Sequence, residues 1–225
     1  MVSIVVLTHN RLGRLQRCLD SIKGFTNEPN EIIVVNNAST DGTTEFLESQ
    51  KGPMFHPIHL DQNWGVIARN HGFDFATGNF IAQVDDDVEV LPGWEGKCLA
   101  CFNKDPSIGL VGQQGGIIKV WMDVHSHVNQ TRNGYVDYMT GFCMMMRNVG
   151  LRYDETFAPF WHEELDLSLQ FKYMGLRLFR VDGLCQHHSA RSTPVDWEVH
   201  DRNLAYANKK WKDRIVNLDL EGMKL

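Results

Sequence analysis

Apolar runs of strand length alternate with segments of helical periodicity through the first part of the chain. Runs rich in apolar and β-branched residues predict strands at Val2–Leu7, Glu31–Val35, His56–Leu60 and Phe80–Val84. Apolar spacing or opening turn residues predict helices between them, at Leu12–Ile22, Ser39–Glu48 and Trp64–Ala76. Strands that alternate with helices are typical of a parallel sheet built from β-α-β units, so the pattern indicates a nucleotide-binding α/β half-sheet.

The pattern is looser after Pro92. Helices are expected at Trp94–Phe102, Glu163–Met174 and Val195–Arg214, extended segments at Ile108–Val120, Val136–Arg147 and Leu176–Val181, and a surface loop at Met122–Gly134. Leu165, Leu167 and Leu169 alternate as they would in a strand, but their neighbours are good helix formers and Gly175 is a suitable end, so we predict a helix there. The sequence contains no internal repeat or linker, which favours one domain.

Three adjacent carboxylates, Asp85, Asp86 and Asp87, directly follow the predicted strand Phe80–Val84. This position is the carboxyl end of a strand, where open α/β sheets bind their ligands. Three like charges side by side raise one another's pKa unless a cation or hydrogen-bond donors hold them ionised. Such a cluster suits Mg²⁺ or Mn²⁺ bridged to the phosphates of a ligand. An acidic turn exposed to solvent is the alternative, because most charge runs lie on the surface.

Short polar side chains follow the first two predicted strands at the same edge of the sheet, Thr8–Arg11 after the first and Asn36–Ser39 after the second. Their hydroxyl and amide groups can hydrogen-bond a base and a ribose, while a cation at the aspartates neutralises a diphosphate. Turn formation alone would also explain Asn36–Gly42, because Asn, Ser, Asp and Gly are turn residues. We therefore expect a polar crevice at this edge.

Composition and charge narrow the class of protein. The 225 residues are 43% hydrophobic and 22% charged, values typical of one soluble globular domain with its own core. The formal net charge of −6 gives no general attraction to nucleic acid or anionic lipid, so nucleic acid is disfavoured as a partner. No apolar run approaches the roughly 20 residues that span a bilayer, so we expect no transmembrane segment, although contact with a membrane surface stays open. The five scattered cysteines suit a reducing compartment, and we expect a cytoplasmic location.

Several motifs follow one another along nearly the whole chain. They are Ser3–Arg11, Glu31–Thr43, Asn63–Gly65 with Ala68–Asn70, Asp85–Asp87, Glu163–Leu169 with Gly175, and His187–His188 near Ser192. In order and spacing this set resembles the family 2 glycosyltransferases of GT-A fold. The resemblance implies a single-domain α/β fold of GT-A type, with a Rossmann-like mixed sheet flanked by helices. It also implies two halves, residues 1–91 binding the nucleotide sugar and residues 92–225 binding the acceptor and carrying the catalytic groups.

The resemblance further implies transfer of a sugar, as by a hexosyltransferase, from a nucleotide-diphosphate donor to an acceptor hydroxyl with inversion, in the synthesis of a glycan or polysaccharide. By position, the residues expected to bind the nucleotide sugar are Thr8, Asn10, Arg11, Asn36, Asn63, Arg69, Asp85 and Asp86. Asp85, Asp87 and His187, or its neighbour His188, would hold Mn²⁺ or Mg²⁺. The family usually has Asp at position 36, and Asn36 differs because it donates hydrogen bonds as well as accepting them.

The acidic segment Glu163–Asp166 supplies the expected base. The acceptor hydroxyl must lose its proton as it attacks the sugar, and a nearby carboxylate is the natural base. Glu164 stands where the family usually has the Asp of its "ED" pair, so the resemblance implies Glu164 as the base, with Glu163 and Asp166 as alternatives. Without the other motifs, these could instead be acidic residues that favour a helix start. Trp161 is the expected acceptor contact, although aromatic residues more often lie in the core.

Two other functions stay open at this point. A nucleotidyltransferase would also use acidic metal ligands, but it needs a basic, glycine-rich triphosphate loop, which the sequence lacks. A module that binds sugar nucleotides or carbohydrates without turnover is the second alternative, and the presence of both the aspartates and Glu164 speaks against it. The expected partners are a nucleotide-diphosphate sugar donor and a glycan or other hydroxyl acceptor.

Overall fold

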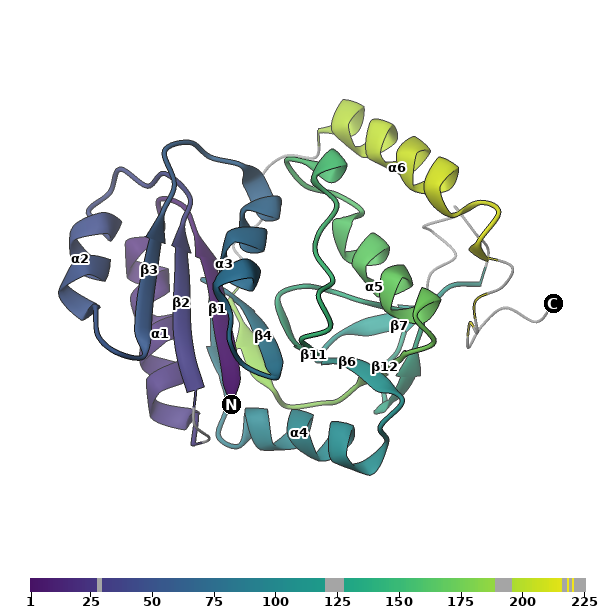
Figure 1. Cartoon of the computed structure of the whole chain (residues 1–225), viewed down its shortest axis with the longest axis horizontal. Helices are drawn as coiled ribbons and strands as arrows, with labels where there is room; N and C mark the ends of the chain where they lie inside the picture. Colours follow the sequence, from purple (N-terminus) through teal and green to yellow (C-terminus); the bar gives the residue numbers. More distant parts are fainter. Residues whose placement is uncertain (28–29, 120–127, 189–195, 216–217, 219, 221–225) are drawn as a thin grey trace.

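The computed structural model describes residues 1–27, 30–119, 128–188, 196–215, 218 and 220 (Figure 1). The helices are α1 (Leu12–Phe25), α2 (Thr43–Gln50), α3 (Arg69–Phe75), α4 (Trp94–Lys104), α5 (Glu163–Tyr173) and α6 (Trp197–Trp211), with the 3-10 turns η1 (Gly65–Ala68) and η3 (Glu155–Phe157). The strands are β1 (Val2–Thr8), β2 (Asn30–Asn36), β3 (Phe55–His59), β4 (Phe80–Asp85), β5 (Val88–Val90), β6 (Ile108–Gly112), β7 (Gly115–Ile117), β8 (Val128–Asn129), β9 (Gly134–Val136), β10 (Tyr138–Met139), β11 (Cys143–Arg147), β12 (Arg177–Arg180) and β13 (Cys185–His187).

A central sheet of eight strands has the order β3-β2-β1-β4-β11-β6-β12-β9. β1 pairs in parallel with β2 and β4, and β2 pairs in parallel with β3. β11 then pairs antiparallel with β4 and β6, and β12 is parallel to β6. The mixed sheet of an α/β fold is therefore confirmed. Because β1, β2 and β4 are parallel neighbours, their carboxyl ends meet at one edge of the sheet, the edge at which such folds bind ligands.

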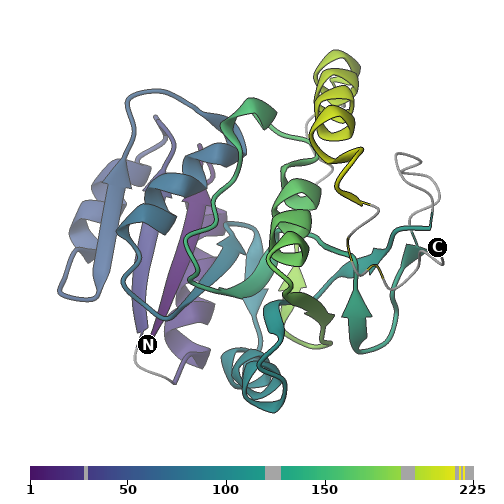
Figure 2. The same ribbon diagram turned by 45° about the vertical axis from the view of Figure 1, so that its right-hand side comes forward.

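Helices cover both faces of the central sheet (Figures 1 and 2). α1, α2 and α4 pack on one face, where Ile4, Val6 and Val34 are buried. α3 and α5 pack on the other face, where Val5, Ile33 and Leu110 are buried. Neighbouring residues of β1 thus enter two different buried layers, which explains why this strand is a continuous apolar run instead of an alternation of apolar and polar residues.

The predicted extended segment Val136–Arg147 divides into parts of three strands. They are the end of β9, then β10, which joins β7 and β8 in a separate three-stranded sheet, and then β11 of the central sheet. The turn between β10 and β11 contains Gly141, which lies beside the candidate site. The predicted segment Ile108–Val120 likewise contains two strands, β6 and β7.

The predicted helix Trp64–Ala76 begins as the 3-10 turn η1 and becomes α-helical only at Arg69. Gly65 explains the difference, because its φ of +65° is left-handed and an added Cβ would lie 2.1 Å from the carbonyl oxygen of Pro159. Only glycine fits this position, where η1 approaches the chain before α5. Val66 N–H donates a hydrogen bond of 2.8 Å to the same carbonyl.

The ambiguous segment after position 162 is helical, as predicted, and forms α5. The helix expected from Ser39 begins at Thr43, after Gly42 in a left-handed turn. Residues 122–127 of the loop expected at Met122–Gly134 lie outside the described residues, and its described part contains β8 and the start of β9. The predicted C-terminal helix is α6, and its expected first residue, Val195, also lies outside the described residues. Within the described part of the chain, no helix is long and apolar enough to cross a membrane.

Candidate active site

A cleft of about 520 Å³ opens at the carboxyl ends of the parallel strands. Thr8 ends β1, Asp85 ends β4 and Asn37 directly follows β2. The lining residues are Leu7, Thr8, His9, Arg11, Asn37, Asn63, Gly65, Val66, Arg69, Asp85, Asp86, Pro159 and Phe160. Those among them that were expected to bind a nucleotide sugar are Thr8, Arg11, Asn63, Arg69, Asp85 and Asp86. The structure therefore brings most of the expected donor-binding residues to one cavity.

Asp86 is buried beside the cleft and paired on both oxygens. Thr8 Oγ1 donates a hydrogen bond of 2.8 Å to Asp86 Oδ2, and Arg11 Nη1 lies 3.2 Å from Asp86 Oδ1. Burial raises the pKa of Asp86, while the Thr8 hydroxyl and the Arg11 guanidinium act against this rise. The carboxyl group thereby holds the end of β1 and the start of α1 in a fixed position relative to β4.

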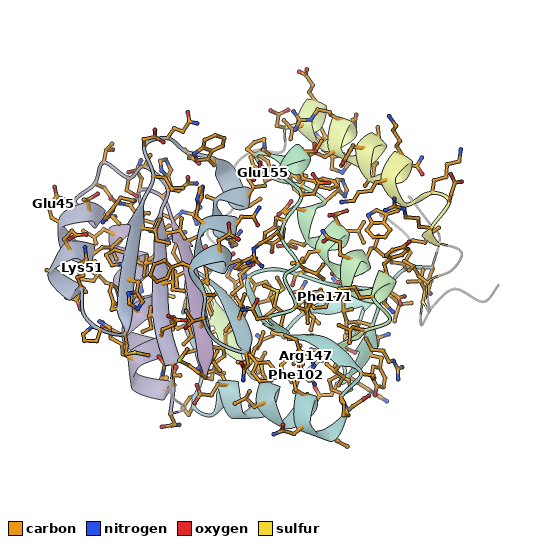
Figure 3. The ribbon with its side chains drawn as sticks, viewed as in Figure 1. Glu45, Lys51, Phe102, Arg147, Glu155 and Phe171 are labelled. Carbon is orange, nitrogen blue, oxygen red and sulfur yellow. The ribbon has the colours of Figure 1, made fainter. Side chains whose placement is uncertain are left out.

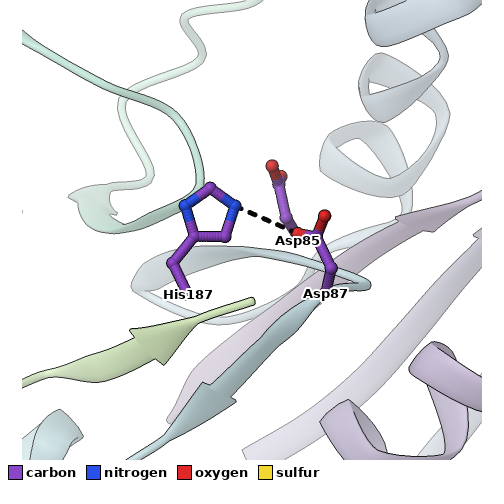
Figure 4. Close-up of side chains that lie close together, drawn as sticks. All are labelled: Asp85, Asp87 and His187. Atoms are coloured by element: carbon purple, nitrogen blue, oxygen red, sulfur yellow. Dashed lines mark ion pairs between the residues drawn. The ribbon is translucent and has the colours of Figure 1, made fainter. Parts of the chain in front are cut away.

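Asp85, Asp87 and His187 form a candidate metal centre (Figure 4). One ligand atom from each residue lies within 4.8 Å of the others. β13 pairs antiparallel with β5, so His187 lies opposite Val88 and its Nε2 is 3.2 Å from Asp87 Oδ1. The ring of Phe142 stacks on this imidazole, with 4.5 Å between the ring centroids. Long-range strand pairing thus carries the histidine to the aspartates.

The donor set of this centre suits a divalent cation. Asp87 Oδ1 is buried and has His187 Nε2 3.2 Å away, but it accepts no hydrogen bond from the residues that the structure describes, so a cation held by both groups would satisfy this oxygen. Carboxylate oxygens suit Mg²⁺ and Mn²⁺, and an imidazole ligand favours the transition metal. The neighbouring His188 lies instead with its Nε2 3.1 Å from Glu89 Oε1. His187 is therefore the histidine of the candidate centre.

Two arginines lie beside the other oxygen of Asp87. Arg11 Nη1 is 3.6 Å and Arg14 Nη1 is 3.5 Å from Asp87 Oδ2. Their positive charges reduce the repulsion within the aspartate cluster. Arg14 was not among the expected site residues, although it lies in the first turn of α1, three residues after Arg11, and this spacing could have indicated it.

Arg69 interacts with carboxylates from both halves of the chain. It is buried, and its guanidinium forms an ion pair with Asp85. Burial disfavours its charge, but the charges of Asp85, Tyr153, Glu164 and Glu163 outweigh this effect and raise the pKa of Arg69 above its ordinary value. Arg69 is consequently a permanent cation between the aspartates of β4 and the acidic pair of α5.

Glu163 and Glu164 begin α5, and both have raised pKa values. Burial, and then the charge of Glu163, raises the pKa of Glu164 from its ordinary value of 4.5 to about 8. Burial also raises the pKa of Glu163 to about 7, although the charge of Arg69 opposes this rise. The two carboxyl groups repel each other and titrate as a pair. A carboxyl group whose pKa lies near neutral pH is well suited to accept a proton from a substrate.

Gly141 leaves room for the carboxyl group of Glu164. An added Cβ at Gly141 would lie 2.5 Å from Glu164 Oε1 and 2.6 Å from Gln83 Nε2. The Gly141 N–H donates a hydrogen bond to Glu164, and Gln83 Nε2 donates one to the Gly141 carbonyl. Tyr153 Oη in turn donates to Gln83 Oε1 at 2.7 Å. This hydrogen-bonded chain ties Glu164 to the middle of β4.

The backbone that leads into α5 is strained and is held by α6. Trp161 and His162 have left-handed φ values of +83° and +68°, a conformation that costs non-glycine residues roughly 1–2 kcal/mol each. Asn203 of α6 is buried, and its Nδ2 donates to the carbonyls of Phe157, Phe160 and Trp161 at 2.8, 2.9 and 3.2 Å. These hydrogen bonds hold the strained segment in place, and with it the acidic pair that follows.

Asn10 and Asn36 shape the loops at the strand ends. Asn10 Oδ1 accepts a hydrogen bond of 2.7 Å from Thr40 N–H. Asn36 is buried, its Oδ1 accepts from Ser39 N–H at 3.0 Å, and its Nδ2 donates to Thr44 Oγ1 at 2.9 Å. Neither residue lines the cleft, so their contact with a nucleotide base stays a prediction.

Asp166 points toward α6. It is 1% exposed, Trp211 Nε1 donates to its Oδ1 at 2.7 Å, and Lys210 Nζ lies 2.8 Å from the same oxygen. This buried ion pair joins α5 to α6. Asp166 therefore has a structural role and takes no part in the proposed chemistry of the acidic pair. Trp161 lies in the loop before α5, with its ring centroid 5.8 Å from that of Phe160.

Some lining residues had no individual role in the expected site, among them Asn37, which belongs to the polar segment Asn36–Ser39 expected at this edge. Asn37 Nδ2 donates to Asn63 Oδ1 at 2.8 Å, and Asn37 Oδ1 accepts from Trp64 N–H at 2.9 Å. Asn37 directly follows a predicted strand, and this position is the signal that placed it in the expected crevice. Pro159 and Phe160 reach the cleft from the second half of the chain, and no local pattern in the sequence indicates that contact.

Known proteins share parts of this sequence. The family model described as Glycosyl transferase family 2 matches residues 3–163. An uncharacterized glycosyltransferase of Escherichia coli K12, YibD, is 31% identical over 93 residues, which are 40% of this chain and 27% of that protein. The chondroitin synthase of Pasteurella multocida Pm70 is 33% identical over 114 residues, which are 49% of this chain and 12% of that protein. The matched part thus covers about a quarter or less of these longer relatives.

A solved structure has a similar arrangement of helices and strands. It is the mannosyltransferase PcManGT from Pyrobaculum calidifontis, determined in complex with GDP-Man and Mn²⁺. The TM-score is 0.66 at 17% sequence identity, and the comparison covers 95% of this chain and 64% of that chain. At this level of identity the similarity concerns the fold.

Proposed function

The chain belongs to glycosyl transferase family 2, and from this premise we propose that it transfers a sugar from a nucleotide-diphosphate donor to an acceptor hydroxyl with inversion. The family and the GT-A type of fold that the sequence motifs indicate are confirmed. The donor, the acceptor and the stereochemical course belong to the proposal, and the arrangement of side chains around the cleft supports them.

The proposed donor site is formed by residues 1–91. Asp86 with Thr8 offers polar groups for a ribose, and Asn63 lies in the same lining. Arg11 and Arg69 bring positive charge to the cleft, which suits a diphosphate. The GDP-Man bound to the similar mannosyltransferase supports a nucleotide sugar as the donor.

The proposed metal is Mn²⁺ or Mg²⁺, held by Asp85, Asp87 and His187. When bound there, the cation neutralises the negative charge that develops on the departing diphosphate. The buried Asp87 oxygen without a hydrogen-bond donor supports this assignment, as does the Mn²⁺ in the similar structure. The two arginines beside Asp87 orient its carboxylate from the opposite side.

Glu164 is the proposed base. Its ionised carboxylate takes the proton of the acceptor hydroxyl, while the hydroxyl oxygen bonds to the anomeric carbon and the bond from that carbon to the diphosphate breaks. One displacement from the face opposite the leaving group inverts the anomeric configuration. Glu163 contributes by raising the pKa of its neighbour, which makes Glu164 a stronger base. Trp161, in the segment that leads into α5, is the proposed acceptor contact.

We further infer that residues 92–225 form the acceptor-binding and catalytic half of one domain. The acidic pair and the loop with Phe160 both come from this half, which supports the division. The five cysteines are free thiols, which supports the expected reducing, cytoplasmic location.

The observation that carries the proposal is that Arg69, which lines the cleft and forms an ion pair with Asp85 of the candidate metal centre, also interacts electrostatically with the acidic pair of α5. Thermal-shift screening of nucleoside diphosphates and their sugars, with and without Mn²⁺, tests the donor site, because a ligand that binds only the folded state raises Tm. We expect Mn²⁺-dependent stabilisation and slow release of nucleoside diphosphate from the sugar nucleotide that binds. If a sugar nucleotide raises Tm but no nucleoside diphosphate is released with any hydroxyl acceptor, the chain is a binding module. If no member of the screen raises Tm, the proposal is refuted.

A further inference from the structure

A row of aromatic rings leads from the cleft to the exposed start of α6. Phe160 lines the cleft, and successive ring centroids are 5.8 Å apart from Phe160 to Trp161, 5.8 Å from Trp161 to His200 and 5.4 Å from His200 to Trp197. Trp197 is the first residue of α6 and is 65% exposed. Figure 1 shows this end of α6 beside the chain that precedes α5. We call these residues the aromatic row.

The rings of the aromatic row meet edge to face. Their interplanar angles are 60°, 76° and 71° along the row. In each such contact the edge of one ring meets the face of the other, so the inner rings partly cover one another, and the side chain of His200 is only 14% exposed. Trp197, at the end of the row, has indole surface open to solvent. Burial of this indole surface by another apolar surface is favourable. The C–H faces of a sugar ring are such a surface, while its hydroxyl groups can stay in water.

We propose that the aromatic row binds an extended, uncharged glycan, the acceptor, whose end to be lengthened lies at Phe160. This inference rests on the proposed function and adds the class of acceptor. Two further rings, Trp161 and His200, separate Trp197 from Phe160, so a single sugar stacked on Phe160 would not also stack on Trp197. The row therefore distinguishes an oligosaccharide from a monosaccharide.

Charges around Trp197 disfavour an anionic partner. Asp196 and Glu198 flank it and are exposed, and the Asp201 side chain is 76% exposed. Asp196 Oδ1 also accepts hydrogen bonds from the first free N–H groups of α6, which are then closed to an anion. Arg202 donates to the backbone of the loop before α5 instead of facing this surface. A polyanion, whether an acidic polysaccharide or a nucleic acid, would be repelled here.

The test compares Trp197→Ala with Tyr173→Ala. Tyr173 is a matched control because it is 59% exposed, lies at the opposite end of α5 from the acidic pair and has its ring against Trp211. Calorimetric titrations would use chitotetraose, cellotetraose and mannotetraose, each beside the methyl glycoside of its monosaccharide. We expect one tetrasaccharide to bind wild type at least about tenfold more tightly than its monosaccharide, Trp197→Ala to remove that advantage, and Tyr173→Ala to retain it.

Donor hydrolysis separates this inference from the proposed function. Trp197→Ala should hydrolyse the donor at the wild-type rate without acceptor, while its KM for the tetrasaccharide rises about tenfold. If wild type binds tetrasaccharide through Trp197 but hydrolyses no donor, the proposed function fails and the glycan surface is supported. The glycan surface is overturned if no neutral tetrasaccharide binds, if Trp197→Ala binds it as wild type does, or if a hyaluronan tetrasaccharide or a single-stranded oligonucleotide binds more tightly.

Discussion

The two halves of the candidate site differ in whether their acidic side chains are paired with cationic or hydrogen-bonding groups. At the ends of β1 and β4, Asp86 is paired with Thr8 and Arg11, and Asp85 is paired with Arg69. At the start of α5, the buried Glu163 and the half-buried Glu164 lie next to each other, and both have raised pKa values. Paired charges suit a surface that holds an ionised ligand, whereas carboxyl groups that titrate near neutral pH suit proton transfer.

The two halves also differ in how their residues are held. The strand ends of the first half are positioned by the register of parallel strands, which many backbone hydrogen bonds maintain. The acidic pair follows two left-handed residues, and hydrogen bonds from Asn203 of α6 hold that segment. Strained, buried acids cost stability, and such costs are typical of functional sites. Figure 3 shows the side chains of the described residues, with Phe171 of α5 labelled.

Of the predicted changes, Glu164→Gln should lower the transfer rate most, because it removes the ionisable group of the catalytic half and leaves the binding half unchanged. We expect the transfer rate to fall roughly 10²–10⁴-fold, the usual contribution of a general base. The measurement is the initial rate of nucleoside diphosphate release with acceptor present. Glu155→Gln, at an exposed position in η3, is the matched control and should keep the wild-type rate. An unchanged rate in Glu164→Gln would exclude Glu164 as the base.

Glu164→Gln should also gain stability relative to wild type as the pH rises. The folded-state pKa of Glu164, about 8, lies above its ordinary value of 4.5. The group therefore favours folding below the ordinary value, and this contribution is lost as the pH rises through about 8. Glu164→Gln carries no such loss, so its Tm relative to wild type should be higher at pH 8 than at pH 5. An equal Tm difference at both pH values would contradict the raised pKa.

Asp87→Asn should affect the binding half and spare the catalytic one. Loss of a ligand carboxylate should weaken activation by Mn²⁺ at least about 100-fold, which a titration of the rate with Mn²⁺ measures. Glu89→Gln is the control, since Glu89 lies on β5, two residues after Asp87, but outside the candidate centre. Equal half-saturating Mn²⁺ concentrations in wild type and Asp87→Asn would rule out this metal centre.

Asn203→Ala should affect the catalytic half indirectly, because it removes the hydrogen bonds that hold the segment before α5. Without the amide, the segment before α5 can relax, and displacement of the acidic pair should lower kcat about tenfold. KM for the donor should stay at the wild-type value, because the donor site belongs to the other half. The kinetics would be measured well below the Tm of the variant, with Lys209→Ala on the exposed face of α6 as the control. Equal changes in kcat and donor KM would point to general loss of structure.

The pH dependence gives the smallest expected effect. Glu164 must be ionised to accept a proton, so with a pKa of about 8 the wild-type rate should rise roughly fivefold from pH 7 to pH 8. The rise should be absent from the residual activity of Glu164→Gln and retained in Glu155→Gln. A wild-type rate that falls over this range would mean that the essential group acts in its protonated form.

The elements of the first half could be predicted because their sequence pattern is local and strong. β1 and β4 each extend only one residue beyond the predicted segment, to Thr8 and Asp85. The start of the predicted helix at Trp64 was wrong, because the conformation of Gly65 depends on contact with Pro159, far away in the sequence. The predicted strand Val136–Arg147 was divided for a similar reason, since β10 pairs with β7 outside the central sheet.

The sequence by itself determined the family, the apolar strands and the chemical types of residue at the strand ends, because these depend on composition and spacing along the chain. Only the tertiary structure decided that His187 instead of His188 lies beside Asp87, that Asp166 faces α6, and that burial raises the pKa of Glu164. The physical reason is that burial and the distance between charges arise from packing. Residues far apart in the chain, such as the acidic pair and Asn203, come together only when the helices and the sheet assemble.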